Sequence, residues 1–285
     1  MKTTTVRSKN SLNRSHVRLA FLLIPLACFA LLPARAVDPQ PDGGYPNQNT
    51  AEGEDALFSL TIGTDNTAIG YQALYKNTRG HANTANGAAA LYRNSTGDLN
   101  TATGFQALWS NNAGSANVGI GAKALFSNTI GSNNTANGYG ALGDNSTGSF
   151  NTATGVVALS FNTTGNFNTA TGSDALSFNT TGMQNTAIGN SALGNNGTGS
   201  GNTAIGNYAL IGNSTGNSNI ALGSSAGIAL TTGDNNIDIS NWGVAGESST
   251  IRIGTTGFQT NTYMAAISGV TVPGGISVIV DGTNY

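Results

Sequence analysis

Residues able to perform acid–base, nucleophilic or metal chemistry are few in this sequence and widely spaced. Beyond residue 36 there is one histidine, His81, which lies beside Gly80 in a turn-like segment. Asp98, Asp144 and Asp174 occupy different places of the repeat described below, so we do not expect them to pair as general acid and base. We therefore predict no catalytic residue, no metal ligand and no cofactor, and a protein that is not an enzyme.

Aromatic residues are the one group whose spacing suggests binding chemistry. Five rings recur at intervals of 17 residues: Phe58, Tyr75, Tyr92, Trp109 and Phe126. If each interval is one coil of a solenoid, the rings form a stripe, called here the aromatic stripe. One interpretation is packing between coils or between chains, and the other is a face that binds a carbohydrate or a protein partner. Changing Tyr92 and Trp109 to Ser distinguishes them, because only the packing role predicts loss of folding.

The first 36 residues differ in composition from the rest. They carry six of the eleven Lys and Arg residues and no Asp or Glu, and an apolar run over 19–32 precedes Ala34-Arg35-Ala36. A basic segment, an apolar core and a small-x-small site are typical of a secretory signal peptide, and we predict cleavage after Ala36. The apolar run is too short for a membrane span of about 20 residues, so the mature chain is predicted to have no transmembrane segment.

Cleavage would also remove Cys28, the only cysteine, so the mature chain is predicted to have no disulfide and no thiol chemistry. The residues after position 36 include five basic and thirteen acidic side chains, a net charge of −8. Because phosphate contacts need clustered Lys and Arg, we do not expect nucleic-acid binding.

A 17-residue repeat dominates the rest of the chain. Asn-Thr-Ala-x-Gly or a weaker copy of it begins, without any insertion, at Asn49, Asn66, Asn83, Asn100, Asn117, Asn134, Asn151, Asn168, Asn185, Asn202, Asn219 and Asn236. The consensus is Asn-Thr-Ala-x-Gly-x-x-Ala-Leu-x-x-Asn-x-Thr-Gly-x-x, whose places are numbered 1 to 17 from the first Asn. Fixed periods of this kind indicate stacked supersecondary units.

The repeat is too short and too rich in Gly for a pair of helices, since each Gly costs a helix about 1 kcal/mol. It suits one β-coil with two short strands and two turns. We expect the Leu of place 9 to form the core and the Ala of places 3 and 8 to lie where a close approach leaves no room for a larger side chain. Place 4 is expected to be partly exposed or to make a contact between chains. The sequence therefore predicts an all-β, parallel β-solenoid of about twelve 17-residue coils.

Turns are predicted where place 12 is Asn and place 15 is Gly, as in Asn162-Thr163-Thr164-Gly165. There the Asn side chain is expected to bond the backbone two residues on, and Gly is free to take positive φ. Five of these turns also match the glycosylation sequon, at Asn94, Asn145, Asn162, Asn179 and Asn213. We interpret them as turn chemistry.

Asn-Thr-Ala-Ile-Gly-x-x-Ala, present at 66–73, 185–192 and 202–209, resembles the head repeat of trimeric autotransporter adhesins and related bacterial tail-fibre-like repeats. The resemblance covers residues 49–240. It implies a left-handed parallel β-roll, assembled as a homotrimer and displayed at a bacterial cell surface for attachment. The better-known head repeats are shorter than 17 residues, and a heptad stalk and an anchoring barrel are not recognisable in these 285 residues, so the resemblance does not say how the rod would be held.

We divide the chain into a signal peptide (1–36), an N-terminal linker (37–48), the repeat solenoid (49–240) and a β-rich C-terminal tail or cap (241–285). In the tail, the segment 249–254 is predicted as one more strand with different spacing, and 263–270 and 276–280 are further β-type runs.

These features predict a secreted or cell-surface structural or adhesive repeat protein of the adhesin-head or fibre type, partnered by itself and by a surface protein or carbohydrate. An ice-binding solenoid is an alternative, because place 2 is nearly always Thr, although such a surface needs two flat Thr columns. A second alternative is a secreted scaffold protein with no adhesive role. A polysaccharide-cleaving solenoid would need clustered carboxylates, and none recur in phase.

Overall fold

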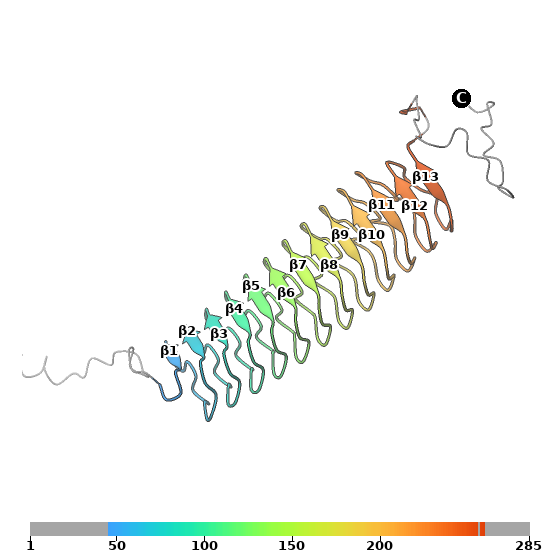
Figure 1. Ribbon diagram of the computed structural model, residues 1–285. Helices are drawn as coiled ribbons and strands as arrows, with labels where there is room; N and C mark the ends of the chain where they lie inside the picture. The colour runs from blue at the N-terminus through green and yellow to red at the C-terminus, as the bar shows by residue number, and fades with distance from the viewer. Residues whose placement is uncertain (1–44, 256, 260–285) are drawn as a thin grey trace, which may run out of the picture.

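The computed structural model describes residues 45–255 and 257–259, which form one elongated β-solenoid (Figure 1). Thirteen three-residue strands lie side by side in chain order in a single parallel sheet. They are β1 (Thr50–Glu52), β2 (Thr67–Ile69), β3 (Thr84–Asn86), β4 (Thr101–Thr103), β5 (Val118–Ile120), β6 (Thr135–Asn137), β7 (Thr152–Thr154), β8 (Thr169–Thr171), β9 (Thr186–Ile188), β10 (Thr203–Ile205), β11 (Ile220–Leu222), β12 (Ile237–Ile239) and β13 (Ile251–Ile253).

This architecture confirms the all-β parallel solenoid of about twelve coils, and no helix is present in the described part of the chain. Accordingly, that part contains no helix with the length and hydropathy of a membrane span. The predicted signal peptide, with its cleavage site at Ala36, lies outside the described residues, as do the β-type runs at 263–270 and 276–280.

The strands pair in the register that the repeat predicts. Thr50 pairs with Thr67 and Ala51 with Ala68, and each later strand up to β12 pairs with its equivalent 17 residues on. The interval between paired residues is three residues shorter in the last pair of strands, where Ile237 of β12 pairs with Ile251 of β13. The extra strand predicted at 249–254 is therefore present with its different spacing.

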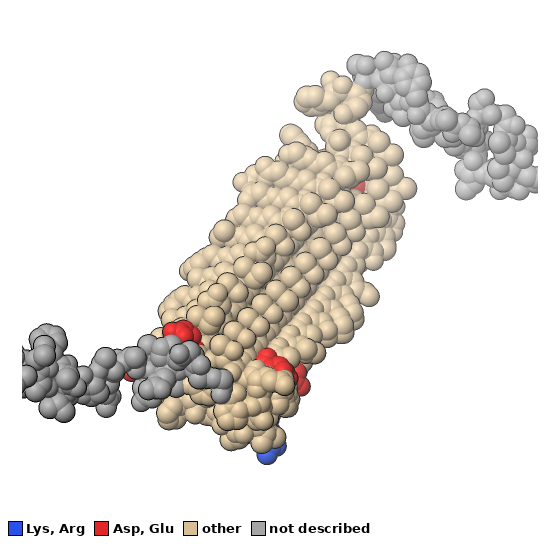
Figure 2. Space-filling model, turned by 60° about the vertical axis from the view of Figure 1, so that its left-hand side comes forward, with Lys and Arg blue, Asp and Glu red and all other residues tan. Residues whose placement is uncertain are grey.

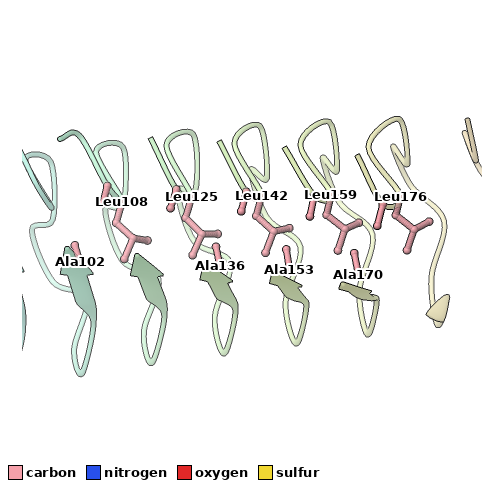
Figure 3. Packing of buried hydrophobic residues seen from close by; sticks show 14 of the residues in the cluster. Ala102, Leu108, Leu125, Ala136, Leu142, Ala153, Leu159, Ala170 and Leu176 are labelled. Carbon is pink, nitrogen blue, oxygen red and sulfur yellow. The ribbon is translucent and has the colours of Figure 1, made fainter. Parts of the chain in front are cut away.

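The core is narrow and consists of Ala and Leu. In each repeat strand the middle residue points inward, as Ala68 does, while the residues at places 2 and 4 are exposed or half-buried. The Leu side chains of place 9 form one row along the rod and face the Ala side chains of the strands (Figure 3). Burial of a Leu side chain contributes about 1.5–3 kcal/mol, so the row stabilises the coils from Leu57 to Leu210 against their neighbours, and the predicted core is confirmed.

Each coil contains one strand, not the two predicted. The segment that carries Ala-Leu at places 8 and 9 has positive φ at alternate residues, for example 55° at Gln72 and 51° at Leu74. An extended strand is excluded by these angles, although coils still bond there: the amide of Leu74 donates to the carbonyl of Ala90 over 3.0 Å. Left-handed φ costs about 1–2 kcal/mol for a residue with a side chain, which burial of the Leu offsets.

Two ladders of buried Asn side chains run along the interior. At place 1, the amide of Asn66 donates to Oδ1 of Asn49 over 2.9 Å, and Nδ2 of Asn66 donates to the carbonyl of Gly80 over 2.9 Å. At place 12, Nδ2 of Asn94 donates to Oδ1 of Asn77 over 2.9 Å. Each link satisfies groups that would otherwise be unpaired in the core, where each costs about 1–3 kcal/mol.

The place-12 turn differs in detail from the prediction. Nδ2 of Asn162 donates to the carbonyl of Gly165, three residues on rather than two, over 3.0 Å. The Gly of place 15 is required by close approach. A Cβ at Gly80 would lie 2.7 Å from Nδ2 of Asn94 and nearer still to Oδ1 of Asn77. Both Asn ladders bond to the carbonyls of these glycines, so the turn leaves no room for a side chain.

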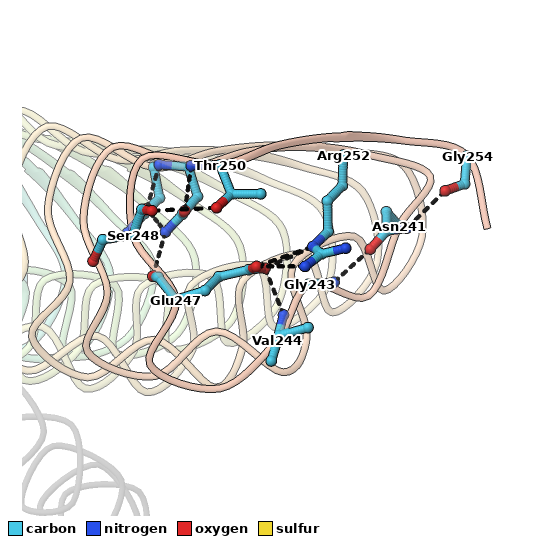
Figure 4. Close-up of polar contacts among 10 residues, drawn as sticks. Asn241, Gly243, Val244, Glu247, Ser248, Thr250, Arg252 and Gly254 are labelled. Atoms are coloured by element: carbon cyan, nitrogen blue, oxygen red, sulfur yellow. Dashed lines mark hydrogen bonds and ion pairs between the residues drawn. The ribbon is translucent and has the colours of Figure 1, made fainter. Parts of the chain in front are cut away.

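The C-terminal coils depart from the pattern. Gly227 stands where the Leu row would continue, Leu230 replaces the Asn of place 12, and Asp238 replaces the Ala at the middle of β12. Beyond β12, Glu247 accepts a hydrogen bond from the backbone amide of Val244 and forms an ion pair with Arg252 of β13 over 2.7 Å (Figure 4).

Candidate functional site

The aromatic stripe predicted from the sequence is a continuous stack of rings. The four successive pairs from Phe58 to Phe126 have ring centroids 5.2, 5.2, 5.7 and 5.3 Å apart and interplanar angles of 8°, 3°, 7° and 9°. Identical register in successive coils causes this, because place 10 of each coil lies directly against place 10 of the next. The structure thus brings all five predicted residues together.

Stacking determines which surfaces of the rings are free. The three inner rings, Tyr75, Tyr92 and Trp109, each have a ring stacked on both faces, so what they expose are edges and, in the tyrosines, hydroxyl groups. Phe58, at the start of the stack, is 67% exposed. The stack ends at Phe58 and at Phe126, each of which has a ring stacked on one face only. This geometry supports the packing interpretation for the three inner rings.

Cationic side chains accompany the stripe. Lys76 Nζ lies 5.8 Å from the centre of Tyr92, the guanidinium carbon of Arg93 lies 4.2 Å from the centre of Trp109, and Lys123 Nζ lies 5.8 Å from the centre of Phe126. Contacts of this kind contribute about 0.5–1 kcal/mol each where solvent is near. They use three of the five basic residues that follow position 36.

A hollow of about 340 Å³ opens where the stripe ends. It arises in the coil that begins at Asn134, which carries Gly140 at place 7 and Gly143 at place 10. Its lining comes from three successive coils and comprises, besides these two glycines, Lys123, Phe126, Tyr139, Asp144, Val157 and Ser160. Such a volume lies at the lower end of the range for small-molecule sites. We call this space the stripe-end hollow.

Sequence reasoning missed the stripe-end hollow, although a signal was present. In the sequence, place 10 changes from a ring to Gly143 and then to Ser160 after Phe126. The importance of the second glycine, Gly140, depends on places 7 and 10 lying side by side on the surface, which the sequence does not show. Two shorter ring stacks were also not predicted as stacks: Phe161 with Phe178 at 5.1 Å, and Phe150 with Phe167 at 5.0 Å.

His81 and Asp98 belong to a backbone-supporting column at place 16. Nδ1 of His81 lies 3.1 Å from the amide of Thr64 in the preceding coil, and the amide of His81 donates to Oδ1 of Asp98 over 2.7 Å. The same contact continues from Asp98 to the hydroxyl of Ser115. Because Asp98 meets the backbone of His81 and not its ring, these residues do not have the geometry of a base and its orienting carboxylate.

The other predicted acidic residues, Asp144 and Asp174, lie in separate coils, and Asp144 contributes to the stripe-end hollow. Among the described residues no group of three His, Cys, Asp or Glu side chains is placed to hold a metal ion. Figure 2 shows a face of the rod with few charged side chains, and most of the acidic ones visible there lie at the end near β1.

Asp238 is the single ionisable side chain buried in the interior of the described solenoid. The pKa of Asp238 is raised to about 6. Burial away from water is the largest cause, the carboxylate of Glu247 also raises the pKa, and the guanidinium of Arg252 partly opposes both effects. Neither carboxyl oxygen has a hydrogen-bond partner. The hydrogen bonds and charge of Arg252 conversely lower the pKa of Glu247.

The sequon asparagines are part of the interior. Asn94, Asn145, Asn162, Asn179 and Asn213 are fully buried members of the place-12 ladder. Oδ1 of Asn213 lacks a partner because Leu230 occupies place 12 of the next coil and ends the ladder. These side chains cannot receive a glycan in the folded rod, which agrees with their interpretation as turn residues.

No family model matches this chain, and no curated protein matches it by sequence. The resemblance to adhesin head repeats therefore rests on the repeat motif alone. The left-handedness of the coil, assembly as a trimer and a role in attachment stay predictions.

Proposed function

We propose that this protein is a secreted, non-catalytic rod that serves a structural or adhesive role at a bacterial cell surface. The observation that carries the proposal is the unbroken register of the coils: the strand pairings and the place-1 Asn ladder continue from β1 to β12, and the Leu row runs from Leu57 to Leu210. A solenoid of this kind holds surface columns at fixed spacing over its whole length. That arrangement suits display and attachment better than turnover of a substrate in one site.

A left-handed coil and self-association as a homotrimer are part of the proposal. The outward face of the sheet becomes apolar toward the C-terminal end. Its exposed residues there are Ile188, Ile205, Ile220, Leu222, Ile251 and Ile253. Exposed apolar surface that is continuous over several strands favours burial against another chain. Three copies packed through this face would cover it, as the adhesin-head resemblance implies.

Light scattering on residues 37–285 tests the assembly. The expected mass is three chains, falling to one in the double variant Ile205→Asp, Leu222→Asp. The matched control is Asn86→Asp, Thr103→Asp, which places the same charges at the same place of the repeat in β3 and β4. A wild-type chain that runs as a monomer would remove the trimer from the proposal.

Protease treatment of intact expressing cells tests the location. Degradation of the protein without cell lysis is expected for a surface rod. Recovery of the intact protein in the medium, with no affinity for cells, would favour the secreted scaffold without an adhesive role.

Ice binding is retained as a second candidate because of one observation. Both outward places of the strands face the same side of the sheet, and in β4, β7 and β8 both are Thr. The other strands carry Glu, Asn, Ile or Leu at place 4, so the Thr surface is interrupted. A measurable gap between the melting and freezing points of its solutions would support this candidate, and no gap would remove it.

A further inference from the structure

The stripe-end hollow is not required by the backbone. Gly140 has a φ of 64°, but residues with side chains adopt the same conformation at place 7 of neighbouring coils, with φ of 58° at Lys123 and 50° at Val157. Gly143 lies outside the positive-φ region, and place 10 of the five coils before it holds an aromatic ring. Side chains are therefore compatible with the backbone at both positions.

Neither glycine is required by a steric clash of the kind found in the turns, although a Cβ at Gly143 would make one tight contact. A Cβ at Gly140 would come no closer than 3.4 Å to Val157, and one at Gly143 no closer than 3.1 Å to the carbonyl of Gly140. By contrast, a Cβ at Gly148 of the same coil would lie 2.8 Å from Nδ2 of Asn162 and closer still to two oxygen atoms. The glycines of the turn are thus structural, whereas the two glycines of the hollow leave surface space that the fold does not need.

The chemistry of the hollow is that of a ring-binding subsite. Phe126 is stacked on Trp109 on one face, and its column continues into the space above Gly143, where no ring follows. Tyr139 and Val157 add apolar surface. The polar groups are the ammonium of Lys123, the carboxylate of Asp144 and the hydroxyl of Ser160.

We infer that the stripe-end hollow binds one neutral pyranose ring of a surface polysaccharide, stacked on Phe126 as the sixth ring of the column. One face of a pyranose carries mainly C–H groups and packs on an aromatic ring, while its hydroxyls project outward. Lys123 and Asp144 supply a donor and an acceptor for those hydroxyls, and their charges cancel. A planar hydrocarbon would leave these polar groups without partners, which is costly on desolvation.

This inference deepens the attachment role and depends on it for its biological meaning, but its physical test does not. The stacked inner rings hold Phe126 in place, so the subsite is preformed, which reduces the ordering cost of binding. The aromatic stripe then acts mainly as a support and its end as the contact. Attachment to polysaccharide would use one such contact per chain, and several in an assembly.

Saturation-transfer NMR on the protein of residues 37–285 tests the inference, with the methyl glycosides of glucose, galactose, mannose and N-acetylglucosamine as probes. We expect at least one of them to bind with a Kd of about 1 mM, the weak affinity of a single small ring. Its strongest signals should come from the C–H protons of one ring face. No saturable binding of any probe up to about a hundred times that concentration would overturn the inference.

Two variants locate the site. Phe126→Leu keeps apolar bulk but removes the ring, and should weaken binding at least tenfold; its matched control, Phe58→Leu, makes the same change at the other end of the stack and should leave the Kd unchanged. Gly143→Phe continues the column into the hollow and should abolish binding, with Gly143→Ser as the control that keeps most of the space. Circular dichroism establishes that each variant is folded.

Equal loss in Phe58→Leu and Phe126→Leu would overturn the inference, as would binding of p-cresol in place of the sugars, which would make the hollow a site for aromatic groups. The mass measurement is independent. A monomer that binds sugar would refute the trimer and keep the subsite, whereas a surface-exposed trimer without sugar binding would refute the subsite alone.

Discussion

The repeating body of the rod (residues 66–226) and its C-terminal coils (residues 227–254) share a parallel sheet but fill the interior differently. In the body, every coil places Ala or Gly at the middle of the strand against the Leu row, and two Asn ladders satisfy the turns. In the C-terminal coils, the Leu and Asn places hold Gly227 and Leu230, and a carboxyl group, Asp238, enters the core. The interval to the next strand also shortens.

The difference teaches that the coil tolerates a buried carboxyl only where its neighbours lose side chains. A Cβ at Gly243 would lie 2.7 Å from Oδ2 of Asp238, and one at Gly227 would lie 3.4 Å from it. In the body the same space is occupied: a Cβ at Gly119, at the middle of β5, would contact the side chain of Leu108 at 3.4 Å. We therefore expect a carboxyl group introduced into the body to lower stability, and replacement of Asp238 by the Ala of the repeat to raise the stability of the C-terminal coils.

The largest effect is expected from placing a carboxyl group in the body. Ala153→Asp at the middle of β7 would bury an unpaired acid against the Leu row, and we expect it to lower the free energy of unfolding by more than about 4 kcal/mol. Thr154→Asp, one residue on and pointing outward, is the control and should change stability by about 0.5 kcal/mol or less. Urea unfolding followed by circular dichroism measures both. Similar losses in the two variants would mean that burial is not the cause.

The next effect concerns the ladders. Oδ1 of Asn151 accepts hydrogen bonds from the amide and Nδ2 of Asn168, and its Nδ2 donates to the carbonyl of Gly165. Asn151→Ala leaves these buried groups unpaired, and we expect a loss of about 2–4 kcal/mol in urea unfolding. Asn137→Ala removes an exposed Asn of the neighbouring coil as the control. A loss below about 1 kcal/mol would show that water replaces the ladder.

Asp238→Ala should do the opposite and stabilise the C-terminal coils. The folded carboxyl has a pKa of about 6, above the 3.8 of the free group, so its contribution to stability is complete below pH 3.8 and is lost as pH rises through 6. The difference corresponds to a cost of about 3 kcal/mol at pH 7. We expect the variant to gain up to that amount at pH 7 and none at pH 3.5.

Hydrogen exchange at amides of β12 and β13 is the suitable measurement for Asp238→Ala, because opening of the last coils need not unfold the body. Glu247 titrates in the opposite sense, since its lowered pKa makes its contribution disappear at acid pH. Comparison of the variant with wild type at each pH separates the two groups. An unchanged pH dependence in the variant would show that Asp238 is not its source.

The smallest effect is expected in the aromatic stripe. Trp109→Ser removes two stacked pairs, and at about 0.5–1.5 kcal/mol per pair the expected loss is about 1–3 kcal/mol. Phe58→Ser removes one pair at the exposed end of the stack and should cost about half as much. Denaturant unfolding measures both. Equal stability of Trp109→Ser and wild type would show that the stack is not a packing device and would return the inner rings to the list of binding candidates.

Much of the fold was predictable because the repeat reports directly on stacking. The register, the Leu row, the buried Ala places and the extra strand near Ile251 were all predicted correctly, since each coil can bury its apolar residues only against an equivalent coil. The second strand per coil was predicted wrongly. Local sequence did not indicate that Leu74 and its equivalents take positive φ, because that conformation is stabilised by burial and by bonds to the next coil.

The sequence by itself determined the period, the residues of the core and the five rings of the aromatic stripe, because a strict repeat imposes one environment on each place. Only the tertiary structure decided which faces of those rings are free, that the sequon asparagines are buried, and that Gly140 and Gly143 open one hollow beside Phe126. The physical reason is that such properties depend on what lies against a side chain in the neighbouring coil, and a linear pattern does not give the orientation of places within a coil.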